Sequence, residues 1–186
     1  MTELRIVRSR RKTLALQVLP TGEIVARAPL RLPERDIHAF AEQHAAWLEA
    51  AVARARAGSR AAQQAGILSE TELQRLRTAA QADLTERVTR LAARMGVDFA
   101  GITIRAQRTR WGSCSARGSL SFNCLLMLAQ PEVREYVAVH ELCHRKQMNH
   151  SAAFWREVAS CLPDYAAQRA WLREHGPALL GRLPET

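Results

Sequence analysis

Residues 131–155, PEVREYVAVHELCHRKQMNHSAAFW, decide the fold and the chemistry that the sequence predicts. They contain His140 and His144, four positions apart, with Glu141 directly after the first, which is the pattern H-E-x-x-H. Residues four apart lie about one turn along the same face of an α-helix, so both imidazoles can reach one ion. Glu141 would then lie beside the open position of that ion and take a proton from a bound water. The pattern therefore predicts a catalytic zinc site on a helix.

The residues around this pattern favour a buried helix that begins at Pro131. Proline suits a first helical position because the N–H that it lacks would be unpaired there. Glu132 and Glu135 fall early in the helix, where negative charge suits the dipole, and Arg145 falls late, where positive charge does. The middle is apolar on most sides, which is typical of a core helix. Ionisable side chains there need partners, which a metal would provide; the alternative is a helix with two core histidines.

A catalytic zinc ion usually has three protein ligands, and His150 is the first candidate for the third. Because His150 lies six residues after His144, the helix must end between them, and Asn149 is a plausible left-handed terminator. The same step occurs in the metzincin pattern H-E-x-x-H-x-x-G-x-x-H. That family does not fit, since Gln147 occupies the glycine position and no methionine follows His150. The fallback ligands are Glu157, Asp164 and Glu174.

Six short motifs follow one another between residues 110 and 176. They are RWGSCS (110–115), SFN (121–123), YVAVHELCH (136–144), MNHSAAFW (148–155), PDY (163–165) and WLREHG (171–176). In these motifs the chain resembles the YgjP-like metallopeptidase family, relatives of the SprT-type zincins. The resemblance is specific over about residues 100–176 and extends to the first 100 residues in layout only.

The resemblance implies a zincin-like α+β fold, one Zn²⁺ per chain and a peptidase-type site. It implies His140, His144 and His150 as metal ligands and Glu141 as the catalytic carboxylate. In the zincin plan an edge strand pairs with the extended backbone of a peptide substrate. As a consequence of the resemblance, we assign that role to residues 119–124.

The N-terminal part predicts strands followed by a helix. Three short stretches, 3–8, 13–19 and 23–28, predict a small antiparallel meander. A helix is expected from Pro33 to about Ala57, and residues 58–66 (GSRAAQQAG) are expected to be a linker. We therefore expect residues 1–66 to hold the β-meander, the helix and the linker, and residues 67–186 to hold the zincin-like core.

In that core the sequence predicts a backing helix and a small mixed sheet. A capping box at Ser69–Glu72 begins a long helix that Gly96 ends, and this helix would back the active-site helix. Residues 102–106 and 119–127 have the pattern of strands. After the metal helix, Ser151 can cap a helix whose Phe154 and Trp155 hold His150 in place. A last helix is expected over about residues 165–174.

Four further residues are candidates around the site, each with a structural alternative. Arg110 and Asn123 could orient a substrate carbonyl or phosphate, or could make structural hydrogen bonds. Tyr165 could donate a hydrogen bond to the transition state, or be a buried structural tyrosine. Asp164 could accept the free N–H of a zinc-bound histidine. Cys143, between two ligands, is expected to be a small buried residue rather than a fourth ligand.

The amino-acid composition limits which partners and which cellular location we expect. The formal charge is +9, and 25 of the 27 basic residues are arginine. A basic surface attracts nucleic acid, nucleotides or anionic membrane; the alternative is a coding bias in a chain rich in Ala and Arg. The four cysteines form no C-x-x-C pair. The first residues lack an apolar signal segment and no run approaches about 18 apolar residues, so we expect a cytoplasmic protein without a membrane partner.

Three functions fit these observations. The first is a zinc-dependent metallopeptidase in which Glu141 is the general base for a metal-activated water. The second is a zinc-dependent hydrolase of nucleotides or phosphoesters, with the same site and an anionic substrate. The third is a nucleic-acid-associated module with a structural zinc. The third is the weakest, because structural zinc usually has four protein ligands and Glu141 would be a needless buried charge.

Overall fold

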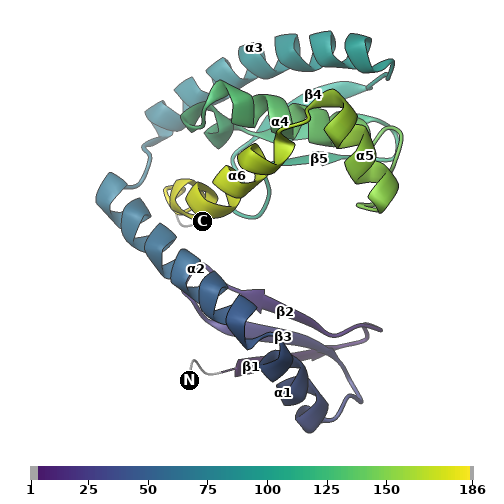
Figure 1. Ribbon diagram of the computed structural model, residues 1–186. Helices are drawn as coiled ribbons and strands as arrows, with labels where there is room; N and C mark the ends of the chain where they lie inside the picture. Colours follow the sequence, from purple (N-terminus) through teal and green to yellow (C-terminus); the bar gives the residue numbers. More distant parts are fainter. Residues whose placement is uncertain (1–3, 185–186) are drawn as a thin grey trace.

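The protein, described by a computed structural model over residues 4–184, has two lobes that helix α2 (Ala45–Ala65) connects (Figure 1). Each lobe contains a three-stranded mixed sheet. The α+β class is therefore confirmed. The N-terminal lobe holds β1 (Leu4–Ser9), β2 (Ala15–Val18), β3 (Ile24–Pro29) and α1 (Glu34–Gln43). The second lobe holds α3 (Glu70–Met95), β4 (Gly101–Arg105), β5 (Gly112–Cys114), β6 (Ser119–Asn123), the 3-10 helix η1 (Cys124–Leu128), α4 (Pro131–Cys143), α5 (Ala152–Cys161) and α6 (Tyr165–Leu180).

The N-terminal sheet has the order β1–β3–β2, so the predicted antiparallel meander is wrong. β2 and β3 form the expected hairpin, and Gly22 supplies its left-handed residue with a φ of 86°. β1, however, pairs with β3 in parallel, with Leu4 opposite Ile24. The reason is burial: consecutive residues of β3, such as Val25 and Ala26, are both inaccessible, so this strand is covered on both faces. Such a strand belongs in the middle of a sheet.

The long helix predicted after Pro33 is two helices that meet at His44, and the predicted linker 58–66 is the end of α2. Alanine, glutamine and arginine dominate that stretch and favour helix. The glycine within it serves close packing: a Cβ on Gly58 would lie 2.5 Å from Cβ of Pro177 in α6. The helix therefore runs unbroken across the junction of the lobes.

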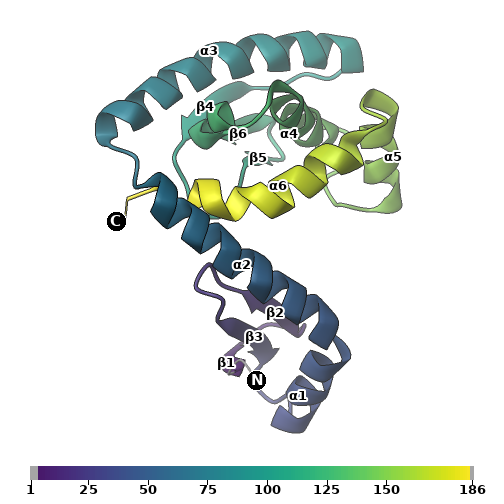
Figure 2. The ribbon, with the colours of Figure 1, turned by 60° about the vertical axis from the view of Figure 1, so that its left-hand side comes forward.

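The end of α6 lies against α2 (Figure 2). This helix continues to Leu180, past Pro177, although the sequence predicted its end before that proline. Beyond it, Nε of Arg182 donates to the carbonyl of Gly66 at 3.0 Å, and the N–H of Leu68 donates to the carbonyl of Arg182 at 2.9 Å. Because the two lobes have separate hydrophobic clusters, a boundary near residue 66 stays our prediction for the domains.

The second sheet has the order β4–β6–β5, which overturns the prediction that residues 119–124 form an edge strand. β6 pairs in parallel with β4 and antiparallel with β5, so both of its edges are occupied. The strand predicted to run to Met127 also ends earlier. The side-chain oxygen of Asn123 accepts from the N–H of Leu125 at 3.1 Å and begins η1. The edge next to the metal helix belongs instead to β5.

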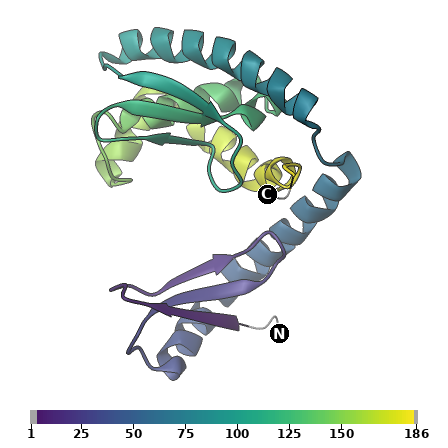
Figure 3. The same ribbon diagram turned by 180° about the vertical axis from the view of Figure 1, so that it is seen from behind.

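The predicted backing helix is confirmed. α3 begins with the capping box, in which the N–H of Ser69 donates to Glu72 at 2.8 Å, and it ends at Gly96 with a left-handed φ of 63°. It packs against α4 and also contacts β4 of the sheet, whose strands lie directly below α3 in Figure 3. Both helices contribute to one core, which includes Leu84, Val88, Leu91, Val133, Val137 and Leu142. No helix within residues 4–184 has the length and apolarity that crossing a lipid bilayer requires.

Candidate metal centre

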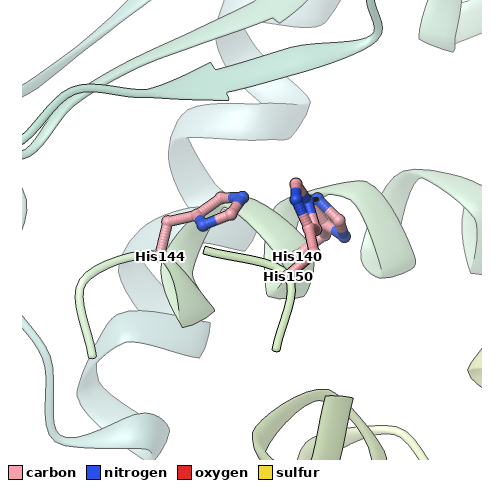
Figure 4. A group of neighbouring side chains, drawn as sticks. All are labelled: His140, His144 and His150. Atoms are coloured by element: carbon pink, nitrogen blue, oxygen red, sulfur yellow. Dashed lines mark hydrogen bonds between the residues drawn. The ribbon is translucent and has the colours of Figure 1, made fainter. Parts of the chain in front are cut away.

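The three predicted imidazole ligands converge where α4 ends, with ring nitrogens turned toward one another (Figure 4). Their candidate ligand atoms lie within 4.8 Å of one another, and Nε2 of His140 is 3.0 Å from Nε2 of His150. Two nitrogens bound at about 2.0–2.1 Å to a tetrahedral ion would be roughly 3.3 Å apart. The arrangement therefore fits one metal ion. Within residues 4–184, no other three His, Cys, Asp or Glu side chains form such a group.

His150 reaches the other two rings because α4 ends at Cys143 and the chain turns back. Backbone bonds to the carbonyl of Cys143 close the last turn with right-handed geometry. Asn149 is not the left-handed terminator that we predicted, since every positive φ within residues 4–184 belongs to glycine. Its side-chain oxygen instead accepts from the N–H of Ser151 at 3.2 Å. Ser151 then caps α5, as predicted, by accepting from the N–H of Phe154.

Two aromatic rings of α5 pack against the histidine cluster. The buried ring of Phe154 has its centroid 4.9 Å from His140, 4.6 Å from His144 and 4.8 Å from His150. Trp155 lies 5.8 Å from His140 and 5.9 Å from His150. These contacts agree with the prediction that Phe154 and Trp155 hold His150 in place. They restrict the rings and so favour a preformed site.

A backbone carbonyl orients His144. Its Nδ1 lies 3.0 Å from the carbonyl oxygen of Gln147, which can only accept, so Nδ1 carries the proton and Nε2 keeps its lone pair for a metal. We had predicted Asp164 for this kind of contact. Its carboxylate instead accepts from Gln168 at 3.4 Å, and no hydrogen bond joins it to a histidine in the described chain. Nδ1 of His140 is buried without a partner.

Burial sets the protonation of the site. It lowers the pKa of His140 to about 3, with smaller contributions from His144 and His150, and it lowers the pKa of His144. Both rings are therefore neutral at pH 7, which is the form that binds metals. Burial raises the pKa of Glu141 to about 8, and the nearby Arg110 guanidinium opposes that rise. A bound dication would favour the ionised carboxylate.

Glu141 borders a small pocket next to the histidines. The pocket has a volume of about 210 Å³ and is lined by Trp111, Gly112, Tyr136, Val137, His140, Glu141 and Leu172. β5 lies against the carboxylate here, since a Cβ on Gly112 would be 2.5 Å from Oε1 of Glu141. The pocket thus joins the first residue of the edge strand, the metal helix and α6.

The three residues predicted to contact substrate or the transition state, Asn123, Arg110 and Tyr165, differ in their surroundings. Asn123 is fully buried, and its Nδ2 donates to the carbonyls of Gln107 at 2.6 Å and Arg110 at 3.1 Å. This placement favours the structural alternative for Asn123. Arg110 has an exposed side chain near Glu141. Tyr165 is half-buried and stacks on Trp155 at 5.4 Å.

The fallback ligands lie outside the histidine cluster. Glu157 pairs with Lys146 at 3.2 Å, and Glu174 is exposed. Cys143 is buried, as predicted, and like the other cysteines it is a free thiol.

Sequence reasoning missed three contributors to the site: the carbonyl of Gln147, the backbone of Gly112 and the side chain of Leu172. Gly112 had a visible signal, because a glycine within an extended stretch often marks the close approach of another group. The other two depend on how α4 ends and on how α6 crosses it. Neither relation is local in the sequence.

The chain belongs to the YgjP-like family, whose metallopeptidase domain matches residues 68–175. This membership makes the protein a metal-dependent peptidase by family. Among solved structures it is similar to the crystal structure of the metallopeptidase zymogen of Pyrococcus abyssi abylysin, with 21% identity and a TM-score of 0.45 over 48% of this chain and 90% of that one. It is also similar to the zymogen of Methanocaldococcus jannaschii jannalysin, with 18% identity and a TM-score of 0.40 over 47% and 94%. No curated protein matches the chain.

Proposed function

We propose that this protein is a zinc-dependent peptidase of zincin-like fold, with one Zn²⁺ held by His140, His144 and His150. The observation that carries the proposal is the convergence of three imidazoles beside the buried carboxylate of Glu141. Three protein ligands and an open position are typical of catalytic zinc, whereas structural sites usually close with a fourth ligand. Within residues 4–184 no cysteine or carboxylate joins the group.

Glu141 is the general base in this proposal. When bound, the ion would supply a Lewis acid that lowers the pKa of a water and polarises the scissile carbonyl. Glu141 accepts the proton of the attacking water and returns it to the leaving amine. The backbone of Gly112 limits the movement of the carboxylate. Burial raises the pKa of Glu141 to about 8 in the metal-free protein, whereas a bound dication would favour the ionised form that accepts a proton.

The outer edge of β5 replaces residues 119–124 as the proposed substrate-binding strand. β5 pairs only with β6 within the described sheet, so its other edge can accept an extended peptide. Because Gly112 begins β5 and touches Glu141, a peptide bound there would pass directly over the carboxylate. Exposed Arg110, which precedes this strand, remains a proposed substrate contact. Tyr165 remains a proposed donor, and the cytoplasmic location remains a prediction.

Metal analysis paired with one substitution tests this function. We expect protein purified without added metal to contain one equivalent of zinc, and Glu141→Gln to keep the metal while losing peptide hydrolysis by about a thousandfold or more. Glu157→Gln is the matched control, since Glu157 lies outside the pocket and pairs with Lys146. Casein and short peptides are the substrates, and nucleoside triphosphates are assayed beside them.

An unchanged rate in metal-replete Glu141→Gln would rule out the proposed role of Glu141. Cleavage of triphosphates but not peptides, lost in the same variant, would assign the site to a nucleotide hydrolase instead. Zinc that cannot be removed without unfolding, with no hydrolysis of either substrate, would favour the structural zinc module.

A further inference from the structure

Arg169 of α6 is an exposed cation that has no acidic partner among residues 4–184. Its guanidinium carbon lies 4.4 Å from the centroid of the Trp155 ring, which places the cation over the ring face. Within residues 4–184, no ion pair includes this side chain. Stacking on Trp155 therefore fixes the position of the Arg169 guanidinium and leaves its positive charge without a counter-charge in the described part of the chain.

That place is beside the metal centre. The Trp155 ring on which Arg169 lies is itself within 6 Å of His140 and His150, at 5.8 Å and 5.9 Å. His140 lines the pocket, and a single aromatic ring, that of Trp155, lies between it and the guanidinium, so Arg169 is placed next to the pocket rather than in its lining.

The same face of α6 reaches the pocket one turn later. Leu172 follows Arg169 by three positions, so the two side chains are neighbours on the helix surface, and Leu172 lines the pocket. Glu141 is the sole acidic residue in that lining, and exposed Arg110 directly precedes Trp111, which also lines the pocket. Arg110 and Arg169 thus lie near a pocket whose one carboxylate, that of Glu141, is the proposed general base. Their field favours an anionic group on the substrate.

We propose that Arg169 binds a carboxylate of the peptide substrate, either an acidic side chain near the scissile bond or the C-terminal carboxylate. This inference rests on the proposed peptidase function. A guanidinium that stacks on an aromatic ring with one face keeps its N–H groups free along the edge, and that edge matches both oxygens of a carboxylate. The stack on Trp155 reduces the side-chain freedom that binding would otherwise remove. Arg169 is thereby a specificity residue of the pocket.

Pairs of synthetic decapeptides test the inference with the zinc-loaded full-length protein. The members of each pair differ by Glu or Gln at one position, the ends are blocked, and cleavage is followed by mass spectrometry. A second set compares a free C-terminal carboxylate with a carboxamide, which separates the two sources of the charge. We expect the wild type to favour the charged member of at least one set by about tenfold in kcat/KM, mainly through KM. High salt should reduce the preference.

Substitutions locate the preference. In Arg169→Gln the ratio of kcat/KM for charged over neutral peptides should fall toward one, and Arg169→Lys should keep part of it. Arg173→Gln removes the same charge from the same helix at a residue that lines another pocket, against α2, and should keep the wild-type ratio. A purely structural Arg169 would lower both rates equally and leave the ratio unchanged.

The outcomes separate this inference from the proposed function. Glu141-dependent cleavage with no charge preference in the wild type would overturn the role of Arg169 and leave the peptidase intact. A preference that persists in Arg169→Gln would do the same. Absence of cleavage of every peptide by the zinc-loaded wild type would overturn the peptidase proposal and this inference together.

Discussion

A Cβ atom on Gly112 would lie 2.5 Å from Oε1 of Glu141, so the first residue of β5 and the proposed general base occupy adjoining space. Real Cβ contacts are not this short, and either the strand or the carboxylate would have to move. Gly112 does not lie in the left-handed region, so its requirement is steric rather than conformational. The edge strand and the metal helix are positioned against each other at this point.

Gly112→Ala should therefore impair catalysis without removing the metal. A displacement of the carboxylate by about 1 Å can lower turnover by roughly a hundredfold, which is the loss that we expect in kcat. Zinc content, measured on the purified variant, should stay at the wild-type value. Gly101→Ala is the matched control because a Cβ there meets nothing within 4 Å. Wild-type turnover in Gly112→Ala would show that Glu141 tolerates the shift.

His150→Ala should weaken zinc binding. The variant keeps His140 on α4 and His144 at its C-cap, but it loses the ring whose Nε2 lies 3.0 Å from Nε2 of His140. The loss in affinity should exceed the roughly 10–100-fold that removing an outer partner of a ligand costs. A chelator competition titration measures it, with His175→Ala, an exposed histidine outside the cluster, as the control. Equal affinities for the two variants would exclude His150 as a ligand.

Asn123→Ala should destabilise the fold. It removes three hydrogen bonds of a side chain with 0% exposure and leaves the carbonyl of Gln107 and the N–H of Leu125 without that partner. The expected loss is about 3 kcal/mol in the free energy of unfolding, measured by urea denaturation. Gln63→Ala removes an exposed amide from α2 and serves as the control. Unchanged stability with a raised KM would instead support a substrate contact.

The metal-free protein should lose stability as the pH rises from about 6.5 to about 8. The pKa of Glu141 is about 8 in the fold and 4.5 as its ordinary value, so in this window the folded state holds a proton that the unfolded state has released. Raising the pH then favours unfolding, by up to about 1.4 kcal/mol per pH unit. Urea denaturation at several pH values measures the slope.

Below about pH 6.5 the histidine acts in the opposite direction. The pKa of His140 falls from 6.5 to about 3 on folding, so the unfolded state takes up a proton first and stability falls as the pH drops. Between about pH 4.5 and 6.5 the two groups oppose each other, because Glu141 still favours the folded state as the pH falls. Metal-free Glu141→Gln should therefore lose the slope above pH 6.5 and lose stability more steeply than the wild type below it. A wild-type slope above pH 6.5 in that variant would assign the effect to another group.

The histidine cluster was predictable because most of its information is local. The spacing of His140 and His144 needs only a helix, and the capping groups at Ser69 and Ser151 are read from a few neighbouring residues. The position of His150 beside the other two rings was predicted from its distance along the chain, although the turn that precedes it contains no left-handed residue. The type and spacing of the histidines were therefore enough to predict the cluster, although the conformation of the loop before His150 was predicted wrongly.

Strand order could not be predicted in the same way, since it depends on pairing between distant segments. β5 is three residues long, too short for alternation to reveal it. The resemblance alone had given the edge role to residues 119–124, which include the central strand β6. The role of Asn123 depended on carbonyls of a loop more than ten positions away. The stretch 58–66 was predicted to be a linker, whereas it forms the end of α2, in which the missing side chain of Gly58 leaves room for Pro177.

The contact between Gly58 and Pro177 bears on how the protein can be shortened. The segment that matches the family, 68–175, stops before Pro177 and excludes all of α2. A recombinant fragment cut to those limits would lose both α2 and the end of α6 that packs against it. It would also drop Leu183, which is 4% exposed and belongs to the main core. Such a fragment should be poorly soluble. The smallest piece suited to separate expression starts upstream of Gly58 and ends after Leu183.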